Sequence, residues 1–478
     1  MTVPEQRADV VVVGGGIAGI SAALAAAEDG AETILLEKAP EDQRGGNTRF
    51  SDAQIRVPHE ADEFSPIGTT HQEMFDDFMQ VTKGRANRDL VHVLVASAPD
   101  AVDWLSEHGV SWEKGFPHTA TYRRRPSGGG KAVLDALYAA AAERGVQFLY
   151  ETGARNLIQG TNGRVVGVRA LGPQGYVDVL GRGGVVLACG GFQANAEMRA
   201  RYFGGWAENL ILRGSRYNTG EGLQMALDIG AQSAGQWGDY HSAVLDANSP
   251  RMEGGVTAIY IYQLGIIVNR HGQRFLDEGE DYRDNTYVKF SKIMTQQPEG
   301  LCYCILDGQA RRDSGWERGV RTITPPHEAD SIGELARLMG VSEATLVQTI
   351  ADYNAAVDRE TPFEPDRKDG KAALGIDPPK SNWALPIEEP PFMAFAVTGG
   401  ITFTFGGLRT DALARVIDTR DKVIPGLYAA GETQGEFFYN NYPGATSVLR
   451  GCVFGRIAAR DAARLANESP ARLDLRLD

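Results

Sequence analysis

Three consecutive glycines, placed directly after a run of apolar β-branched residues, constrain this chain more than any other feature. Residues 9–13 have the composition of a strand buried in a parallel sheet, and residues 14–19 follow it with the pattern GxGxxG. An alanine-rich helix is expected over residues 21–29, and a second strand over residues 32–36 ends in Glu37. This order of elements predicts a βαβ unit with a tight glycine turn between its first strand and its helix.

Each part of that turn has a physical reason that points to a dinucleotide. Gly14 permits the sharp turn, Gly16 lets a pyrophosphate approach the backbone, and Gly19 lets the helix pack closely on the strand. The free N–H groups and the positive dipole at the helix start attract phosphate. The carboxylate of Glu37 can accept a hydrogen bond from a ribose hydroxyl. The sequence therefore predicts a dinucleotide-binding domain of the α/β class.

The charge balance limits the partners of the chain. Its 478 residues carry 62 Asp and Glu against 48 Lys and Arg, a formal net charge of −14. This balance disfavours non-specific binding to nucleic acid, because phosphate contacts need clustered Lys and Arg. No run of about 18 apolar residues occurs, so we expect no membrane span. Acidic residues precede the first apolar segment, where a signal peptide is basic, so we expect a cytoplasmic protein.

Cysteine and histidine usage argues against bound metals and clusters. The 4 cysteines form no CxxC, haem-attachment or ferredoxin-type pattern, and the 8 histidines show no HxxxH or HExxH spacing. We therefore expect no disulfide framework and no metal site. If the chain moves electrons, it must pass them to a separate acceptor.

The distribution of glycine-rich motifs predicts how the chain is divided. These motifs stand near both ends, whereas residues 236–377 mix strands with helix signatures. An insertion between two parts of one nucleotide-binding domain would explain this pattern. The remaining predicted helices cover residues 70–82, 89–108, 131–144, 331–339, 342–357 and 453–466, and the remaining predicted strands cover residues 146–150, 165–170, 184–189, 258–268, 301–306 and 393–404.

Five segments, in a fixed order along the chain, carry a resemblance to a known family. They are Val13-Gly-Gly-Gly-Ile-Ala-Gly19 with Glu37, Leu187-Ala-Cys-Gly-Gly-Phe192, Asn218-Thr-Gly-Glu-Gly222, Gly272-Gln-Arg-Phe-Leu-Asp-Glu278 and Ile424-Pro-Gly-Leu-Tyr-Ala-Ala-Gly-Glu432. In these segments the chain resembles the flavoprotein family of fumarate reductase and succinate dehydrogenase, which also contains 3-ketosteroid dehydrogenases and tricarballylate dehydrogenase. The resemblance covers nearly the whole chain and is closest to the tricarballylate dehydrogenase branch.

The resemblance implies an α/β fold in which a Rossmann-like FAD-binding domain is interrupted by a smaller α+β capping domain. The predicted bounds are 1–236 and 378–478 for the FAD-binding domain and 237–377 for the cap. The expected cofactor is FAD, without a covalent link, because no histidine stands near Thr48. The residues expected to contact it are Gly14, Gly16, Ile17, Ala18, Gly19, Glu37, Lys38, Gly46, Asn47, Thr48, Gly190, Gly191, Gly431, Glu432, Ser447 and Val448.

Two departures from fumarate reductases bear on the substrate. Those enzymes carry a histidine in a His-Thr-Met-Gly-Gly segment and an arginine before the last glycine pair. The matching stretches here place Phe403 and Tyr442 at those positions. Two anchors for a dicarboxylate are therefore missing. The Tyr-Pro-Gly sequence at residue 442 instead resembles 3-ketosteroid dehydrogenases, in which a tyrosine hydroxyl and a glycine N–H polarise a ketone.

Three residues are predicted to act in catalysis. Arg283 lies one residue from the family position of an arginine that serves as acid in fumarate reductases; the alternative is an ion pair with Asp281 or Glu278 on a solvated turn. Tyr442 is predicted to donate to an oxyanion or to transfer a proton, and the alternative is a buried aromatic at a turn. His241 resembles a family histidine that binds a substrate carboxylate, although a lone histidine is more often structural.

These observations predict an FAD-dependent dehydrogenase. It would form a C=C bond next to the carboxylate of a small, tricarballylate-like acid or the ketone of a cyclic oxo compound, by hydride transfer to flavin N5 with a proton transfer. The expected electron acceptor is a separate molecule: oxygen, a quinone or a redox protein. Alternatives are an ene-reductase of the fumarate reductase type, an enzyme like 3-ketosteroid dehydrogenase, and a non-catalytic flavin-binding subunit.

Overall fold

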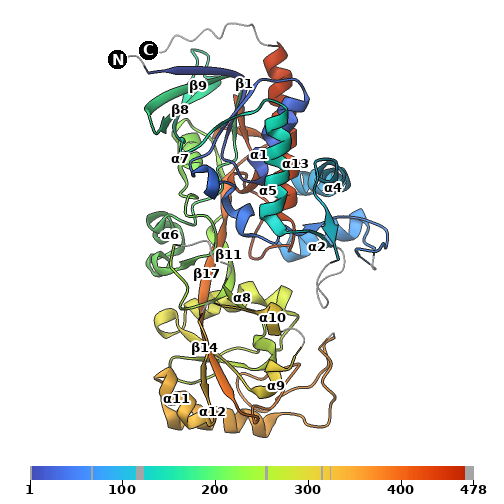
Figure 1. Ribbon diagram of the computed structural model, residues 1–478, viewed down its shortest axis with the longest axis vertical. Coiled ribbons are helices and arrows are strands. Elements are labelled where there is room, and N and C mark those ends of the chain that lie inside the picture. The colour runs from blue at the N-terminus through green and yellow to red at the C-terminus, as the bar shows by residue number, and fades with distance from the viewer. Residues whose placement is uncertain are drawn as a thin grey trace. The chain divides into compact units, whose positions relative to one another are not determined.

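The computed structural model describes residues 3–65, 68–114, 123–252, 257–313, 316–322, 324–365 and 367–468. The chain forms two compact units (Figure 1). Unit 1 consists of Met1–Glu208, Gly214–His241 and Phe403–Asp478, and unit 2 consists of Asn209–Arg213 and Ser242–Thr402. The chain changes unit four times, and two of these changes fall within long strands, β11 (Ser233–Asp246) and β17 (Phe392–Leu408). The predicted domain bounds themselves stay a prediction.

An 8-stranded sheet forms the centre of unit 1. The order of its strands is β18 (Arg415–Ile417), β19 (Val423–Ala429), β9 (Gly175–Leu187), β1 (Glu5–Val13), β2 (Thr33–Leu36) and β6 (Gln147–Leu149). In addition, β8 (Val165–Gly172) pairs with β9, and β7 (Gly153–Gln159) pairs with β8. The pairs β19–β9, β9–β1, β1–β2 and β2–β6 are parallel. The predicted βαβ unit is confirmed, with β1 and β2 as neighbours.

Helices cover one face of this sheet. Figure 1 shows α1 (Ile17–Glu28), α5 (Gly129–Glu143) and α13 (Ser447–Glu468) packed together there. Val10 and Val12 face these helices, whereas Val11 and Val13 belong to the core of the opposite face, as the two-residue period of a strand requires. The remaining elements of unit 1 are α2 (His71–Val81), α3 (Arg88–Ala96), α4 (Ala98–Glu107), α6 (Ala196–Phe203), α7 (Glu221–Asp228), and the three strands β3 (Ile55–Arg56), β4 (Trp112–Glu113) and β5 (Arg123–Pro126).

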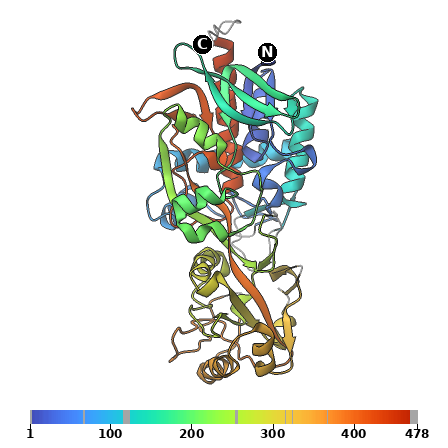
Figure 2. The same ribbon diagram turned by 90° about the vertical axis from the view of Figure 1, so that its left-hand side faces the viewer.

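Unit 2 has a 6-stranded sheet of its own, seen in Figure 2 beside its helices. Its main path is β10 (Ile211–Leu212), β17, β14 (Cys302–Leu306) and β13 (Ile266–Asn269), and β11 and β16 (His327–Ala329) also pair with β17. Helices α11 (Ile332–Met339) and α12 (Glu343–Ala356) pack on one face, and α8 (Arg283–Thr295) packs on the other. Short elements complete the unit: β12 (Ala258–Ile259), β15 (Val320–Arg321), α9 (Gly308–Arg311) and α10 (Trp316–Gly319).

Several predicted elements differ from the structure: α1 begins at Ile17 rather than at residue 21, and β9 begins at Gly175 rather than at residue 184. The helix expected over residues 89–108 is two helices, α3 and α4. Pro99 lies in the first turn of α4, where a missing N–H costs nothing. In the middle of one continuous helix the same proline would remove a backbone hydrogen bond and break the helix. The strand expected over residues 258–268 is divided by a 3-10 turn, Tyr262–Leu264. The last helix begins at Ser447 rather than at residue 453, which brings its start next to the glycine loops described below.

Two further features concern membranes and metals. Over the ranges that the structure describes, no helix combines the length and the apolar character that crossing a membrane requires. In the same ranges, no three His, Cys, Asp or Glu side chains gather as a group able to hold a metal ion.

Candidate functional site

The glycine turn between β1 and α1 needs glycine at two positions for steric reasons. Gly14 has a φ of 103°, a conformation that other residues rarely adopt, and a Cβ there would lie 2.4 Å from the carbonyl oxygen of Ala188. A Cβ on Gly19 would lie 1.7 Å from the carbonyl oxygen of Gly14. These two glycines are therefore required by the protein itself.

Gly16 is different, because the protein leaves room beside it. A Cβ there would meet nothing nearer than the Gly45 carbonyl oxygen at 3.6 Å and Thr48 Oγ1 at 3.9 Å. Gly16 is also the N-cap of α1 and has no side chain to cap the helix, so the start of α1 lies beside this space without a side-chain cap. The absence of a side chain at Gly16 thus suits a group outside the protein, as expected for a pyrophosphate.

Glu37 closes the turn from the end of β2. Its carboxylate is buried and accepts hydrogen bonds from the backbone N–H groups of Gly15 (2.9 Å) and Ala39 (2.8 Å). Burial raises the pKa of Glu37, while these N–H groups oppose that shift. The Tyr138 hydroxyl donates to the carbonyl oxygen of Gly15 at 2.9 Å and holds the same loop from α5.

A second glycine loop lies against the first. The N–H of Ile17 donates to Thr48 Oγ1 at 3.1 Å, which ties the start of α1 to the segment Gly46–Phe50. Asn47 Oδ1 accepts the N–H of Ser215 at 2.8 Å. A Cβ on Gly46 would lie 3.8 Å from the Cα of Gly16, so the two glycines face each other.

A third and a fourth glycine segment complete the arrangement. A Cβ on Gly191 would lie 2.3 Å from Glu432 Oε1. The carboxylate of Glu432 is buried and accepts a hydrogen bond from the N–H of Thr404 at 2.7 Å. Burial raises the pKa of Glu432, and the hydrogen bond from Thr404 opposes that shift. A Cβ on Gly431 would lie 2.8 Å from the Cβ of Ala18. Loops from four distant parts of the chain therefore meet in unit 1.

These residues fit an elongated dinucleotide cofactor. The four glycine loops bring together the start of α1, the buried carboxylates of Glu37 and Glu432, and two glycines, Gly16 and Gly46, where a side chain would meet no protein atom nearer than 3.6 Å. The structure brings together the predicted contacts from the turn at Gly16, the loop at Thr48, the segment at Gly191 and the loop at Glu432. Lys38 is held by an ion pair with Glu221 at 2.7 Å. The roles of all these residues toward the cofactor stay predictions.

The start of α13 holds the hydroxyl of Tyr442. The N–H groups of Thr446 (3.2 Å) and Ser447 (3.4 Å) donate to this oxygen, and Ser447 Oγ lies 3.2 Å from it. Tyr442 is half-buried, and Val448 in the next turn is buried. The position of the phenol oxygen is thus set by the backbone of the helix start.

Tyr442 belongs to a cluster of rings that we call the aromatic box, made of His241, Phe403, Phe438 and Tyr442. His241 stacks on Phe403 with ring centroids 4.6 Å apart and an interplanar angle of 6°. Tyr442 meets His241, Phe403 and Phe438 edge-on, at 4.9, 5.2 and 5.2 Å. Two of the predicted catalytic residues, His241 and Tyr442, therefore lie together, although 200 residues separate them in the chain.

Arg283, the third predicted catalytic residue, belongs to unit 2. It begins α8, and its guanidinium carbon lies 5.1 Å from the ring centroid of Tyr260. The two carboxylates considered as its alternative partners have other ion pairs: Glu278 with Arg274 at 2.5 Å and Asp281 with Lys368 at 2.6 Å. Its proposed role as an acid stays a prediction.

Several residues at the site were not predicted. Tyr138, Thr404 and Gln193 contact the glycine loops or Glu432, and Arg450 is a buried arginine in the first turns of α13. Only Arg450 left a signal in the sequence, as a single charged residue among the apolar residues and glycines of 448–455. Hydroxyls and amides such as Thr404 are too common to single out without the fold.

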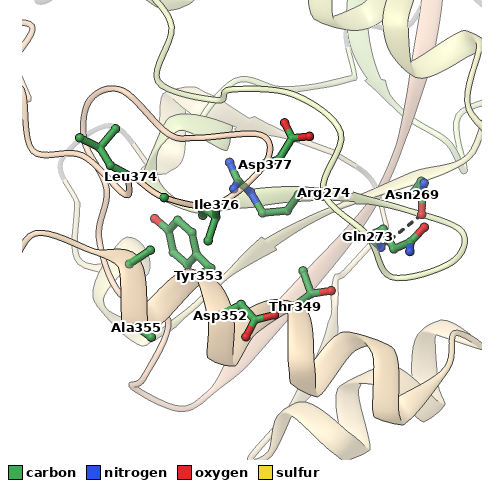
Figure 3. A pocket seen from close by; sticks show the side chains of 12 residues that line it. Asn269, Gln273, Arg274, Thr349, Asp352, Tyr353, Ala355, Leu374, Ile376 and Asp377 are labelled. Carbon is green, nitrogen blue, oxygen red and sulfur yellow. Dashed lines mark hydrogen bonds between the residues drawn. The ribbon is translucent and has the colours of Figure 1, made fainter.

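A separate cavity of about 820 Å³ lies within unit 2 (Figure 3). Arg274 and Tyr353 project into it, with Asp377 on the facing loop. Arg274 is already bound by Glu278 and by the carbonyl oxygen of Pro378 at 2.6 Å. The positive charge of Arg274 is therefore satisfied by the protein.

Comparison with known proteins places these features in context. The family model described as FAD binding domain matches residues 9–449. A probable fumarate reductase of Shewanella frigidimarina is 30% identical over 97% of this chain and 76% of its own length. A urocanate reductase of Eggerthella lenta is also 30% identical, over 96% of this chain and 75% of its own length.

Solved structures agree with this result. The open conformation of a flavocytochrome c3 fumarate reductase superposes with a TM-score of 0.82 at 28% identity, covering 97% of this chain and 79% of that one. A 3-ketosteroid Δ1-dehydrogenase from Sterolibacterium denitrificans superposes with a TM-score of 0.77 at 23% identity, covering 96% and 100%. The second likeness concerns the fold alone.

Proposed function

This chain belongs to the FAD binding domain family, and from that premise we propose that it is a dehydrogenase forming a C=C bond next to a carboxylate or ketone. It is accordingly an FAD-dependent oxidoreductase that acts on carbon–carbon bonds. We propose three further points: which group lies next to the C=C bond, what shape the substrate has, and in which direction the reaction runs. The observation that carries it is the aromatic box with the anchored hydroxyl of Tyr442.

Bound FAD supplies a two-electron acceptor for hydride. The chain's own residues would hold it at the glycine loops, with the helix start at Gly16 toward the pyrophosphate and Glu37 toward a ribose. Glu432 and the start of α13 at Ser447 would complete the site. No histidine lies in the loop at Thr48 that could form a covalent link.

Tyr442 is suited to polarise a carbonyl or carboxylate oxygen. A phenol oxygen has two lone pairs and one hydrogen. The N–H groups of Thr446 and Ser447 occupy the lone pairs, so the hydrogen is directed elsewhere, to Ser447 Oγ or to a substrate oxygen. A donor held in place by a helix start stabilises negative charge that develops on that oxygen during the reaction.

The aromatic box favours a substrate with a planar or cyclic group. A dicarboxylate substrate would need a charged or hydrogen-bonding partner for its second carboxylate, but Phe403 offers only an apolar ring. Burying that carboxylate without a partner would be costly. Stacked and edge-on rings suit another flat group, as His241 against Phe403 already shows. The relative named urocanate reductase fits this idea, since urocanate joins an aromatic ring to an unsaturated carboxylate. We therefore propose a ring-bearing acid or a cyclic ketone.

His241 and Arg283 complete the proposal. The ring of His241, stacked in the box, is assigned to substrate binding. Arg283 is assigned to the proton that leaves the carbon next to the carbonyl, because a guanidinium can relay a proton through its neighbours or hold a carboxylate. The second candidate function is the reverse reaction, reduction of the C=C bond, which the names of both relatives favour.

Anaerobic mixing of the yellow holoenzyme with saturated substrates tests the function. We expect 3-phenylpropionate or a substituted cyclohexanone to bleach the visible absorption of the bound flavin, and succinate to leave it unchanged. Tyr442→Phe should slow the bleaching about 100-fold, the typical cost of removing one oxyanion donor. Reduction by succinate alone would contradict the substrate class, and reoxidation of reduced enzyme only by unsaturated acids would favour the reductase.

Tyr439→Phe is the matched control. Tyr439 is a half-buried tyrosine three residues before Tyr442, and Arg85 lies 4.5 Å above its ring. Loss of its hydroxyl should leave the rate of flavin bleaching unchanged. If the two variants lose activity equally, the hydroxyl of Tyr442 has no special role.

A further inference from the structure

Arg450 is a buried cation that the proposed reaction does not use. It is 3% exposed, and among the described residues its guanidinium makes one hydrogen bond, from Nη1 to the carbonyl oxygen of Gln434 at a long 3.4 Å. Its Nε is buried with no partner in the described ranges. The guanidinium carbon lies 4.4 Å from the ring centroid of Phe438 and 5.2 Å from that of Phe437. The rings supply contact, but they do not neutralise the charge.

The position of Arg450 links it to the predicted cofactor contacts. Its neighbour Gly451 packs on the start of α1: a Cβ there would lie 2.7 Å from Ile17 Cγ2 and 3.3 Å from the N of Ala18. A Cβ on Gly431 would lie 3.9 Å from the Cα of Gly451. Three segments therefore meet at Gly451, the residue after Arg450: the first turns of α13, the start of α1 and the loop that holds Glu432.

The charges at this point favour an anion. The positive dipole ends of α1 and α13 lie close to Gly451, and Arg450, one residue earlier in α13, adds a full positive charge to this region. Burial lowers the pKa of Arg450 to about 10, so the residue remains a cation at neutral pH. Glu432 is the nearby carboxylate, but its oxygens are committed to Thr404 (2.7 Å) and Gln193 (3.3 Å). A buried charge with unused donors is costly unless a ligand satisfies it.

Another buried arginine on the same helix shows the difference. Arg456 lies six residues further along α13 and is 4% exposed, like Arg450. Its Nη1 forms an ion pair with Asp100 at 2.9 Å, and its guanidinium stacks over Trp104 at 4.7 Å. The Nε of Arg456 also has no partner in the described ranges, but Arg456 has a carboxylate of its own, whereas no described carboxylate is in contact with Arg450.

We propose that Arg450 stabilises the negative charge of the reduced flavin and so raises the reduction potential of bound FAD. The inference rests on the cofactor placement proposed above. With FAD bound, transfer of a hydride would bring two electrons and one proton to the flavin and would leave it with one negative charge, while the second substrate proton would leave to a base. A cation that favours this charge pulls the equilibrium toward flavin reduction, and therefore toward the dehydrogenase direction.

The test is a redox titration of the holoenzyme without substrate. In Arg450→Gln, the ratio of reduced to oxidised flavin at a fixed potential should fall at least about tenfold, which is about 30 mV for a two-electron couple. Arg450→Lys, which keeps the charge, should stay close to the native protein. Arg456→Gln, the matched control, should lose stability but keep the native potential. An unchanged potential in Arg450→Gln overturns the proposal.

Proton uptake by the native holoenzyme gives a second test that needs no variant. If the reduced flavin is an anion, reduction takes up one proton. At a fixed potential, the ratio of reduced to oxidised flavin then falls about tenfold for each unit by which the pH rises. Uptake of two protons, with about a hundredfold fall per pH unit, overturns the proposal.

A loss of substrate binding in Arg450→Gln with an unchanged potential would assign the cation to a substrate carboxylate instead. Because no substrate is used in the titrations, failure of the proposed substrate class would not affect them.

Discussion

Both units of this protein bury charged side chains, but they treat these charges differently. In unit 2, the buried carboxylate of Glu278 pairs with Arg274 and also accepts the N–H of Ile267 at 2.8 Å. Lys380, fully buried in the same unit, donates to the carbonyl oxygens of Gln263 and Gly265, both at 2.7 Å. In unit 1, the described residues leave Nε of Arg450 without a partner, and a Cβ at Gly16 would meet no protein atom nearer than 3.6 Å.

This difference separates a structural use of charge from a use that needs a ligand. A charge whose donors are all satisfied within the protein contributes to one unique packing and has little left for a substrate. A charge that is desolvated yet incompletely bonded is stabilised when a ligand arrives. From this contrast we expect cofactor binding in unit 1, and we expect the buried Glu278–Arg274 ion pair of unit 2 to contribute to stability.

Loss of the buried carboxylate in unit 2 should have the largest effect on stability. Glu278→Gln leaves the buried guanidinium of Arg274 without its counter-charge, so we expect the free energy of unfolding to fall by about 3–5 kcal/mol. Urea denaturation measures it. Glu280→Gln is the control, because Glu280 pairs with Lys289 at an exposed site worth about 0–1 kcal/mol. Equal losses in both variants would remove the distinction between the units.

A methyl group in the open space of unit 1 should act on the cofactor rather than on the fold. Gly16→Ala meets protein atoms only at van der Waals distance and at a φ of −70°, so we expect unchanged folding. We expect FAD affinity to fall by about 1–3 kcal/mol, or tenfold to 100-fold, because the methyl group occupies cofactor space. Equilibrium titration of apoprotein with FAD measures this change.

Gly205→Ala is the control for that experiment. A Cβ at Gly205 meets no atom within 4 Å, and the residue lies outside the glycine loops. Native FAD affinity is expected for this variant. If Gly16→Ala also binds FAD with native affinity, the cofactor does not approach the backbone at Gly16.

A pH dependence that belongs to unit 2 is expected as well. Burial lowers the pKa of Lys380 to about 8, from an ordinary value of 10.5. Between these two values the unfolded chain holds this proton and the folded protein does not, so stability should rise as pH increases through that window. Denaturation at pH values across the window measures the slope, and Lys380→Met should reduce it. Identical slopes for the two proteins would contradict the shift.

Part of the site was readable from the sequence because its signals are local. The glycine turn, the strand before it and the carboxylate at Glu37 follow one another within 30 residues, and each is recognisable from composition and spacing. The two-residue alternation of Val10 to Val13 between two cores is a direct consequence of strand geometry. The early start of α13 was missed because its first two turns contain Arg450 and Gly451 among their apolar residues.

By itself, the sequence determined the cofactor fold and the chemistry class, since these depend on short motifs whose backbone geometry admits few alternatives. Only the tertiary structure decided which distant side chains meet. Contacts such as His241 with Phe403 and Tyr442, or Glu432 with Thr404, join positions that are far apart in the chain or share no periodic pattern. The unmatched charge of Arg450 is likewise a property of its surroundings, because a guanidinium is satisfied or left unsatisfied only by the groups that folding brings to it.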